Sequence, residues 1–584
     1  MSWFERIAAE AARVEKSEEG TVPQDVADKL AQHVPQSFTL RELADAAREA
    51  LGQARASRPR LHQRTDMTES FVHSPAKREK AGPCLVSLLA CLRCEDRIAR
   101  GPAGDDEDAV RELALGVAHV IAPVVAAQRQ EEADETGQRS ELSGQELLER
   151  SEEFSEHCLG LAGPGVEILS ALVTRPASPV RLHDEVLLTL LAYSGDETRP
   201  CRPGAETATR AAADRLLQQQ FGVPGAPTKE HFVTETVLQA FLRPLFSKSK
   251  PSTITASGRK AEYVDGAAAS RAESMPDDTA LTKPWKFTDL RAIPAAGWAV
   301  READAQLVAK HWPLFIPVLL TLVDDIATSV RRRGLLILAD FLAKMPGRTL
   351  HDTGLASLFE DAVFPTLAFL PSLTPERESV ELLGPAYLAL RRLAEKKQPA
   401  AGKDGVAGSP KNKLLDRMLR EGVFLGYFHA KEHVGIVELL CRQTETILNE
   451  MGVHAVKHLK DLVPMCSAIM TDPFAPVAPQ VLVSAIKALQ AVLANCWPRI
   501  PGSPWQDEII NALALCWLHV LEHDRYPSGE MRARLERELL TTSKALAAVL
   551  RTAEAEGGTT MELESHTAPL VAKDPRLAPL FSSS

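Results

Sequence analysis

The sequence predicts an all-α, HEAT/armadillo-like helical-repeat solenoid, and three observations support this fold class. A helix, a short break and a second helix recur from about Trp312 to Leu550, at intervals of about 40 to 57 residues, close to the period of HEAT and armadillo repeats. Apolar residues in successive helices step by three and four, as on the buried face of a helix. The composition is 45% hydrophobic but only 5% aromatic, with many Ala and Leu residues, and this favours helix over strand.

The first predicted helix pair carries the clearest repeat signature. An apolar helix ends at Asp324 and Asp325, and the next helix begins at Val330 and Arg331 with leucines at helical spacing. An Asp at such a turn can cap the following helix, and we expect Arg331 to reach back to it from the neighbouring unit. Later units are predicted to begin near Gly354, Lys411, Val453 and Trp505.

Helix ends within the repeats are marked by residues that stop a helix. Thr471–Pro473 and Trp497–Arg499 each place a proline after an apolar helix, and proline cannot continue the hydrogen-bond ladder. Gly452 follows Met451 and is expected to cap the helix that ends there.

The rest of the chain divides into segments of different composition. Residues 1–246 predict an irregular helical region, 285–553 the C-terminal repeats, and 554–584 a C-terminal tail. Residues 247–284 hold almost no large apolar side chains, so we expect a disordered loop there. A second insert, Lys396–Lys413, interrupts the repeats. Helices are predicted within the first segment at Phe38–Leu51, Cys84–Ile98, Ala109–Arg129, Glu146–Val173 and His231–Phe246.

Charge and apolar runs weigh against two classes of protein. The net charge of −11 and the pI near 5.9 argue against a nucleic-acid binder, which needs clustered Lys and Arg. The N-terminal helix lacks the apolar core of a signal peptide. The longest apolar run, Leu113–Ala127, is shorter than the roughly 20 residues of a membrane span, so no membrane association is expected.

The nine cysteines are odd in number and lie on apolar helix faces, which predicts reduced core thiols in a cytoplasmic and nuclear protein. Cys91 and Cys94, with Cys84 nearby, have no second pair to complete a zinc site, so core thiols are again favoured.

His429, Glu432 and His433 match H-x-x-E-H, in which two histidines on one helix face bind zinc and the glutamate acts as general base. The motif lies at a predicted junction between helices, so the two histidines would not share a face. A polar turn whose Glu and His cap the next helix is the favoured interpretation, and a zinc hydrolase stays a remote alternative. We expect no catalytic residues, cofactor or metal.

His454, His458 and Asp461 have the spacing of a second metal site. Lys457 and Lys460 flank them and oppose a cation, so a solvated face or a partner contact is favoured.

Four residues are candidates for partner binding. Trp and Arg are enriched at interface hot spots, which draws attention to Trp497 and Arg499 at a helix boundary. The alternative for Trp497 is that it packs between consecutive repeats. The candidates are Trp497, Arg499, His458 and Lys460.

The C-terminal half, from about 285 to 550, resembles the Tti-two family, the second Tel-two-interacting proteins, in a form similar to that of filamentous fungi. The resemblance rests on the order and spacing of four pieces, Trp312–Leu335, Phe359–Pro365, Val456–Leu462 and Asn495–Ile500.

This resemblance implies a non-catalytic scaffold or co-chaperone subunit of the Triple T complex, with the Tel-two and Tti-one proteins as partners. It implies a role with the Hsp-ninety chaperone system in maturing phosphatidylinositol-kinase-related kinases, and so links to the DNA damage response, telomere maintenance and TOR signalling. The alternative is a HEAT-repeat adaptor of another complex, in nuclear transport or as a phosphatase scaffold.

Overall fold

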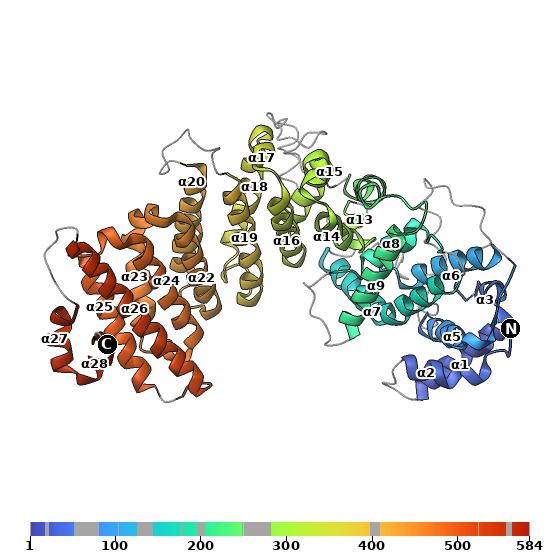
Figure 1. The fold of residues 1–584 in the computed structure, drawn as a ribbon, viewed down its shortest axis with the longest axis horizontal. Coiled ribbons are helices and arrows are strands. Elements are labelled where there is room, and N and C mark those ends of the chain that lie inside the picture. Colours follow the sequence, from blue (N-terminus) through green and yellow to red (C-terminus); the bar gives the residue numbers. More distant parts are fainter. Residues whose placement is uncertain are drawn as a thin grey trace, which may run out of the picture. The chain divides into compact units, whose positions relative to one another are not determined.

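The fold is all-α, as predicted (Figure 1). The computed structural model describes residues 2–17, 23–48, 50–51, 81–102, 104–124, 144–176, 179–195, 205–247, 249, 279, 282–397, 409–523, 525–555 and 563–582. The chain forms two compact units, Met1–Thr321 and Leu322–Ser584.

The first unit is an irregular assembly of helices around the apolar helix α5 (Ala81–Arg93), which packs against α1, α2 and α7. Its other elements are α1 (Trp3–Ser17), α2 (Pro23–Leu30), η1 (Ala31–His33), β1 (Phe38–Thr39), α3 (Leu40–Ala47), η2 (Glu95–Arg97), β2 (Ile98–Ala99), α6 (Asp105–Ile121), α7 (Gly144–Thr174), α8 (Asp184–Leu191), α9 (Ala205–Phe221), α10 (Lys229–His231), the π-helix η3 (Phe232–Leu242), α11 (Arg243–Phe246), α13 (Pro284–Phe287), α14 (Ala292–Glu302) and most of α15 (Ala305–Val323).

Two predicted helices are shorter than expected because their ends pair as strands. Phe38 lies opposite Ile98 and Thr39 opposite Ala99, in parallel register. The side chain of Thr39 then caps α3 by accepting a hydrogen bond from the Glu42 N–H, so the helix begins only after the strand.

The cysteines of the described residues are buried free thiols, as predicted. Burial raises the pKa of the Cys84 thiol to about 12 and also raises the pKa of Cys91 and Cys94. A neutral thiol in an apolar helix packs as a small hydrophobic residue. Cys201 lies outside the described residues.

A buried arginine joins two helices of the first unit. The guanidinium of Arg291 donates to Glu185 Oε1 of α8 at 2.6 Å, to Thr189 Oγ1 at 3.1 Å and to Asp289 Oδ2 at 2.8 Å. Burial alone would lower the pKa of Arg291, but Asp289 and Glu185 outweigh it and raise the pKa. The network fixes α8 against the start of α14.

The second unit is a stack of helix pairs, and the pairs begin where the sequence predicts them. The first pair is the end of α15 with α16 (Thr328–Lys344), and the second pair, which follows α17 (Gly347–Thr353), is α18 (Leu355–Val363) and η4 (Phe364–Ala368) with α19 (Glu376–Lys396). The third pair is α20 (Pro410–Arg417), the π-helix η6 (Met418–Phe424) and α21 (Leu425–Ala430) with α22 (Val434–Met451). The fourth pair is η7 (Gly452–His458) and α23 (Leu459–Met470) with η8 (Ala475–Val477) and α24 (Pro479–Cys496), and the fifth pair, which follows η9 (Trp497–Arg499), is α25 (Pro504–Glu522) with α26 (Gly529–Ala555).

Three segments that the sequence analysis set apart from the repeats are partly helical in the structure or lie largely outside the described residues. Helix α20 begins at Pro410, so the last residues of the predicted insert Lys396–Lys413 are helical, while 398–408 lie outside the described residues. Most of the predicted loop 247–284 also lies outside them. The C-terminal segment 554–584 contains α27 (Leu563–Lys573), η10 (Pro575–Leu577) and α28 (Ala578–Phe581).

Hydrogen bonds at both ends show that the second helices of the pairs run parallel. At their starts, the Thr328 hydroxyl of α16 donates to Glu378 Oε2 of α19 at 2.9 Å. Glu376 Oε1 of α19 accepts from the Gly435 N–H of α22 at 2.8 Å. At their ends, Arg391 of α19 contacts Glu450 of α22 at 2.6 Å.

The same holds for α24, because Asn495 Nδ2 donates to Asn449 Oδ1 of α22 at 3.0 Å near their C-terminal ends. The turns within pairs therefore share one edge of the stack, and the connections between pairs share the opposite edge. We define the turn edge as 324–328, 369–378, 428–434 and 471–478, and the connection edge as 452–460 and 497–505.

Two glycines are required by the backbone. A Cβ atom at Gly334 would lie 2.7 Å from the carbonyl carbon of Leu322, so only glycine lets α16 approach α15 this closely. Gly452 has φ of 58° and its N–H donates to the Leu448 carbonyl, which confirms the predicted cap of α22.

Three helices are long and apolar enough to cross a membrane by length and composition alone: Glu146–Thr174, Ala305–Val323 and Pro479–Arg499. The expectation drawn from uninterrupted apolar runs overlooked them. Within the described residues, 44%, 56% and 67% of their most apolar windows are buried inside the protein.

Candidate partner-binding surfaces

The Asp–Arg signature of the first pair forms its hydrogen bonds within one repeat. The expectation that Arg331 reaches the Asp from a neighbouring repeat is therefore wrong. Arg331 Nε donates to the Asp325 carbonyl at 3.0 Å, and its guanidinium stacks 4.5 Å from the Phe369 ring centre. The Asp325 carboxylate accepts from the Ala327 N–H at 2.9 Å and closes the turn. Burial lowers the pKa of Arg331, while Asp324 and Asp325 oppose this change.

The H-x-x-E-H residues do not share a helix. His429 lies in α21, whereas His433 precedes the first residue of α22. His433 makes no side-chain cap, contrary to the favoured interpretation. The cap comes from Glu376 of the preceding pair, which accepts from Gly435 and faces His433 Nδ1 at 3.2 Å. Among the described residues, no three His, Cys, Asp or Glu side chains are grouped to hold a metal ion.

His458 is buried, with 5% of its surface exposed, so the expected solvated face is wrong at this residue. Its Nε2 is hydrogen-bonded to Asp416, which also contacts Lys457 Nζ at 2.8 Å and Arg420 at 3.2 Å. Burial lowers the pKa of His458, and the hydrogen bond to Asp416 opposes this change. These contacts hold η7 against α20, and they leave His458 no surface for a partner.

The other three candidate residues are accessible on the connection edge. Trp497 is half-buried in η9, Arg499 in the same short helix is exposed, and Lys460 is exposed at the start of α23. Elements η9 and η7 contact each other, and η7 carries the exposed Val453. The edge thus combines basic side chains with partly exposed apolar ones, the composition of many interface hot spots. Whether it binds a partner stays a prediction.

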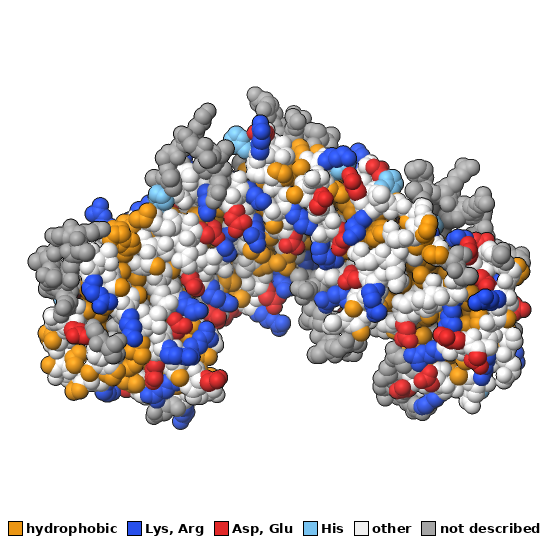
Figure 2. Space-filling model, viewed as in Figure 1, with side chains coloured by type: hydrophobic (Ala, Val, Ile, Leu, Met, Phe, Trp, Pro, Cys, Tyr) orange, Lys and Arg blue, Asp and Glu red, His pale blue; other side chains and the backbone are white. Residues whose placement is uncertain are grey.

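The turn edge carries a second set of exposed side chains, which the sequence analysis missed. Periodicity assigns large apolar residues to the core, yet Leu373 is 83%, Phe474 78% and Phe428 73% exposed. The one available signal was their position beside turn residues, as in Asp472-Pro473-Phe474. The exposed large apolar side chains of this edge are Ile326, Leu373, Phe428, Val434, Phe474 and Val477. Figure 2 shows that apolar side chains are exposed among charged ones on the face in view.

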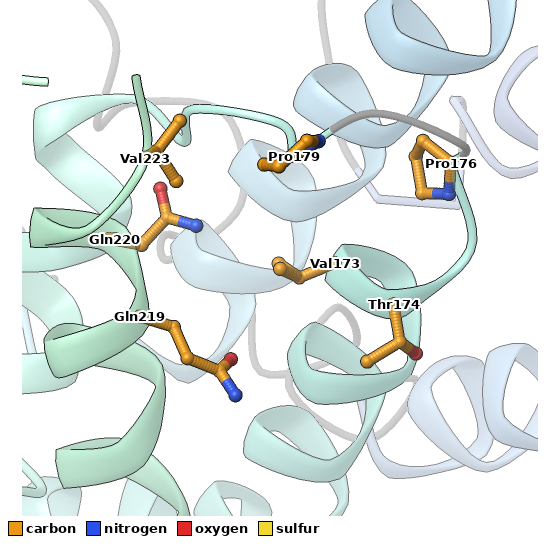
Figure 3. A pocket seen from close by; sticks show the side chains of 7 residues that line it. All are labelled: Val173, Thr174, Pro176, Pro179, Gln219, Gln220 and Val223. Carbon is orange, nitrogen blue, oxygen red and sulfur yellow. The ribbon is translucent and has the colours of Figure 1, made fainter. Parts of the chain in front are cut away.

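A small cavity lies in the first unit between α7 and α9 (Figure 3). Its volume is about 310 Å³, and its lining residues are Val173, Thr174, Pro176, Pro179, Gln219, Gln220 and Val223. The amide of Gln220 is already used, because it accepts from the Leu182 N–H at 2.8 Å and donates to the Val180 carbonyl at 3.1 Å. The described lining residues offer apolar and amide groups, and among them only the Thr174 hydroxyl could act as an acid, base or nucleophile.

Stacked helix pairs with accessible edges place the protein in the class of helical-repeat solenoids. The chain belongs to the Tti2 family, whose family model matches residues 186–477. The match runs from α8 to η8, so it includes the turn edge except its last residue, 478, and ends before Trp497 and Arg499.

Among solved structures, the chain is similar to the crystal structure of SYS-1 at 2.6 Å resolution, with 10% sequence identity and a TM-score of 0.36. That similarity covers 99% of this chain and 93% of the other. No curated protein matches the chain.

Proposed function

We propose that this protein is a non-catalytic scaffold and co-chaperone subunit of the Triple T complex, with the Tel-two and Tti-one proteins as partners. Membership of the Tti2 family is the observation that carries the proposal. Together with the Hsp-ninety system, the complex would support maturation of phosphatidylinositol-kinase-related kinases, in the cytoplasm and nucleus. The links to the DNA damage response, telomere maintenance and TOR signalling belong to the same proposal.

We assign the connection edge to the partner solenoid, Tti-one. Helical-repeat proteins bind along extended surfaces, and a half-buried Trp beside an exposed Arg supplies a large apolar contact with a directional charge. The partner surface is expected to be acidic, because Arg499 and Lys460 are both exposed there.

The test is a tagged pull-down from native cell extract, with partners identified by mass spectrometry. Near-stoichiometric recovery of Tel-two and Tti-one is expected. The doubly substituted chain Trp497→Ala/Arg499→Glu should recover about ten-fold less Tti-one, as expected when two hot-spot residues are lost. Arg525→Glu changes an exposed arginine in the turn of the fifth pair and is the matched control.

Recovery of transport or phosphatase subunits in place of Tel-two and Tti-one would refute the Triple T assignment. Normal recovery of Tti-one by the Trp497→Ala/Arg499→Glu chain would instead refute only the role of the connection edge. Unchanged thermal unfolding of that chain would show that its fold is intact.

A further inference from the structure

We infer that the turn edge is a second docking surface, and that it binds a basic amphipathic helix of a partner protein. The observation is a row of exposed apolar side chains along four consecutive helix pairs, flanked by carboxylates. The surface lies on the edge opposite Trp497 and Arg499, so the inference goes beyond the proposed function.

The row follows from the fold. The second helices run parallel, and the Glu378–Thr328 and Glu376–Gly435 hydrogen bonds bring the starts of α16, α19 and α22 together. Each turn before such a start therefore contributes to the same edge. Because four successive turns place large apolar side chains in water, the exposure is a property of the edge rather than of one loop. Contiguous exposed apolar patches mark interaction sites in soluble proteins.

The charges of the turn edge favour a basic partner. Four exposed carboxylates flank the apolar row, from Asp324, Glu378, Glu432 and Asp472. The exposed cations of these segments are Arg377 and Lys431. Arg377 Nε is already paired with Glu381 Oε1 at 3.2 Å. A partner with Lys or Arg beside its apolar stripe therefore meets complementary charge, which speeds association and selects against acidic partners.

The spacing of the row favours a helix over an extended peptide. Packed helices lie about 8–10 Å apart, so neighbouring turns are separated by the rise of about five to seven helical residues. A helix with apolar residues in a heptad pattern, about 20 residues long, can thus contact all four turns. In the described residues of this unit no strand lies at the edge, so an added strand would find no partner to pair with.

The probe is a fluorescein-labelled model peptide of about 21 residues, with Leu at the a and d positions of its heptads, Lys flanking them and Ala elsewhere. A matched peptide carries Glu in place of every Lys. Fluorescence anisotropy with the full chain measures both affinities. The basic peptide is expected to bind at least about ten-fold more tightly than the acidic one, and high salt should reduce the difference.

The chain Phe428→Ser/Phe474→Ser should lose at least about ten-fold in affinity for the basic peptide. Glu432→Lys should lower the affinity for the basic peptide and raise the affinity for the acidic one. Val453→Ser removes an apolar side chain that is 54% exposed on the opposite edge and should leave both affinities unchanged. Because Phe428 and Phe474 are mostly exposed, their replacement leaves the core intact, which thermal unfolding checks.

Three outcomes would overturn the inference: no binding of the basic peptide, equal binding of both peptides, or unchanged binding by the Phe428→Ser/Phe474→Ser chain. The same chain is also taken through the pull-down described above. The Phe428→Ser/Phe474→Ser chain is expected to recover Tti-one normally, which would show that the turn edge is not the Tti-one site. Loss of Tti-one there would mean that the turn edge is the Tti-one site, which contradicts a second partner.

Discussion

Arg331 shows how a single side chain closes a turn between two helices. Its guanidinium donates a hydrogen bond to the carbonyl of Asp325 and lies over the ring of Phe369. Arg331→Ala removes the ring contact and the hydrogen bond to the carbonyl of the buried Asp325, so the free energy of unfolding should fall by about 1–3 kcal/mol. Urea denaturation measures the change. Arg348→Ala removes an arginine whose side chain is 92% exposed, and its effect should stay within about 0.5 kcal/mol.

His458 predicts a dependence of stability on pH. Burial holds its pKa below the ordinary value of 6.5, so the unfolded chain takes up a proton before the folded chain does as the pH falls. The unfolded state therefore binds more protons below about pH 6.5, and the stability that neutral His458 contributes above this pH is lost as the pH falls.

The measurement is the urea midpoint between pH 7.5 and pH 5.5 for the natural chain and for His458→Gln. Glutamine can still donate to Asp416 but does not titrate, so the midpoint of this variant should change less with pH. Equal pH dependence of the two chains would show that His458 does not contribute to it.

The two residues also mark a limit of sequence reasoning about the site. Spacing placed His458 on a helix face but could not show that Asp416, 42 positions away, covers that face. The Asp–Arg signature identified the turn correctly, but it did not reveal that Arg331 bonds to backbone carbonyls of its own repeat. Both features depend on packing that brings distant segments together, which periodicity does not describe.

Among the helices, the approach of α16 to the end of α15 depends on one missing side chain. A methyl group at Gly334 would lie 2.7 Å from Leu322, so Gly334→Ala should lower the free energy of unfolding by about 1–3 kcal/mol. Gly160 in α7 is the control, because no atom outside its own helix backbone and chain neighbours would lie within 4 Å of the new Cβ. Gly160→Ala should instead stabilise the chain by about 0.5–1 kcal/mol, because alanine loses less backbone entropy in a helix. Urea unfolding of both variants tests the opposite signs.

The helix pairs could be predicted from sequence because each helix repeats its apolar face many times and ends at Pro, Gly or Asp. The strand pair Phe38–Thr39 with Ile98–Ala99 could not, since two residues carry no detectable alternation. The turn edge was missed for a different reason. Large apolar residues are assigned to the core by default, and the position of Phe474 beside Asp472 and Pro473 marks a turn without showing how exposed its side chain is.

At the scale of the second unit, its two edges predict that two partners can be held at once. The turn edge and the connection edge lie at opposite ends of the same helices, so their ligands do not compete for surface. The basic peptide should therefore bind the chain in complex with Tti-one about as tightly as it binds the free chain, within about three-fold. Anisotropy titration with the purified complex measures this, and displacement of either ligand by the other would contradict it.

The cross-links between neighbouring pairs give the stack a mechanical property. Glu376 and Glu378 join successive helices at one edge, while Arg391 with Glu450 and Asn449 with Asn495 join them at the other. Bending the stack toward either edge stretches the bonds of the opposite one. The second unit should therefore resist bending in both directions, so that ligands bound at its two edges would stay at a fixed separation.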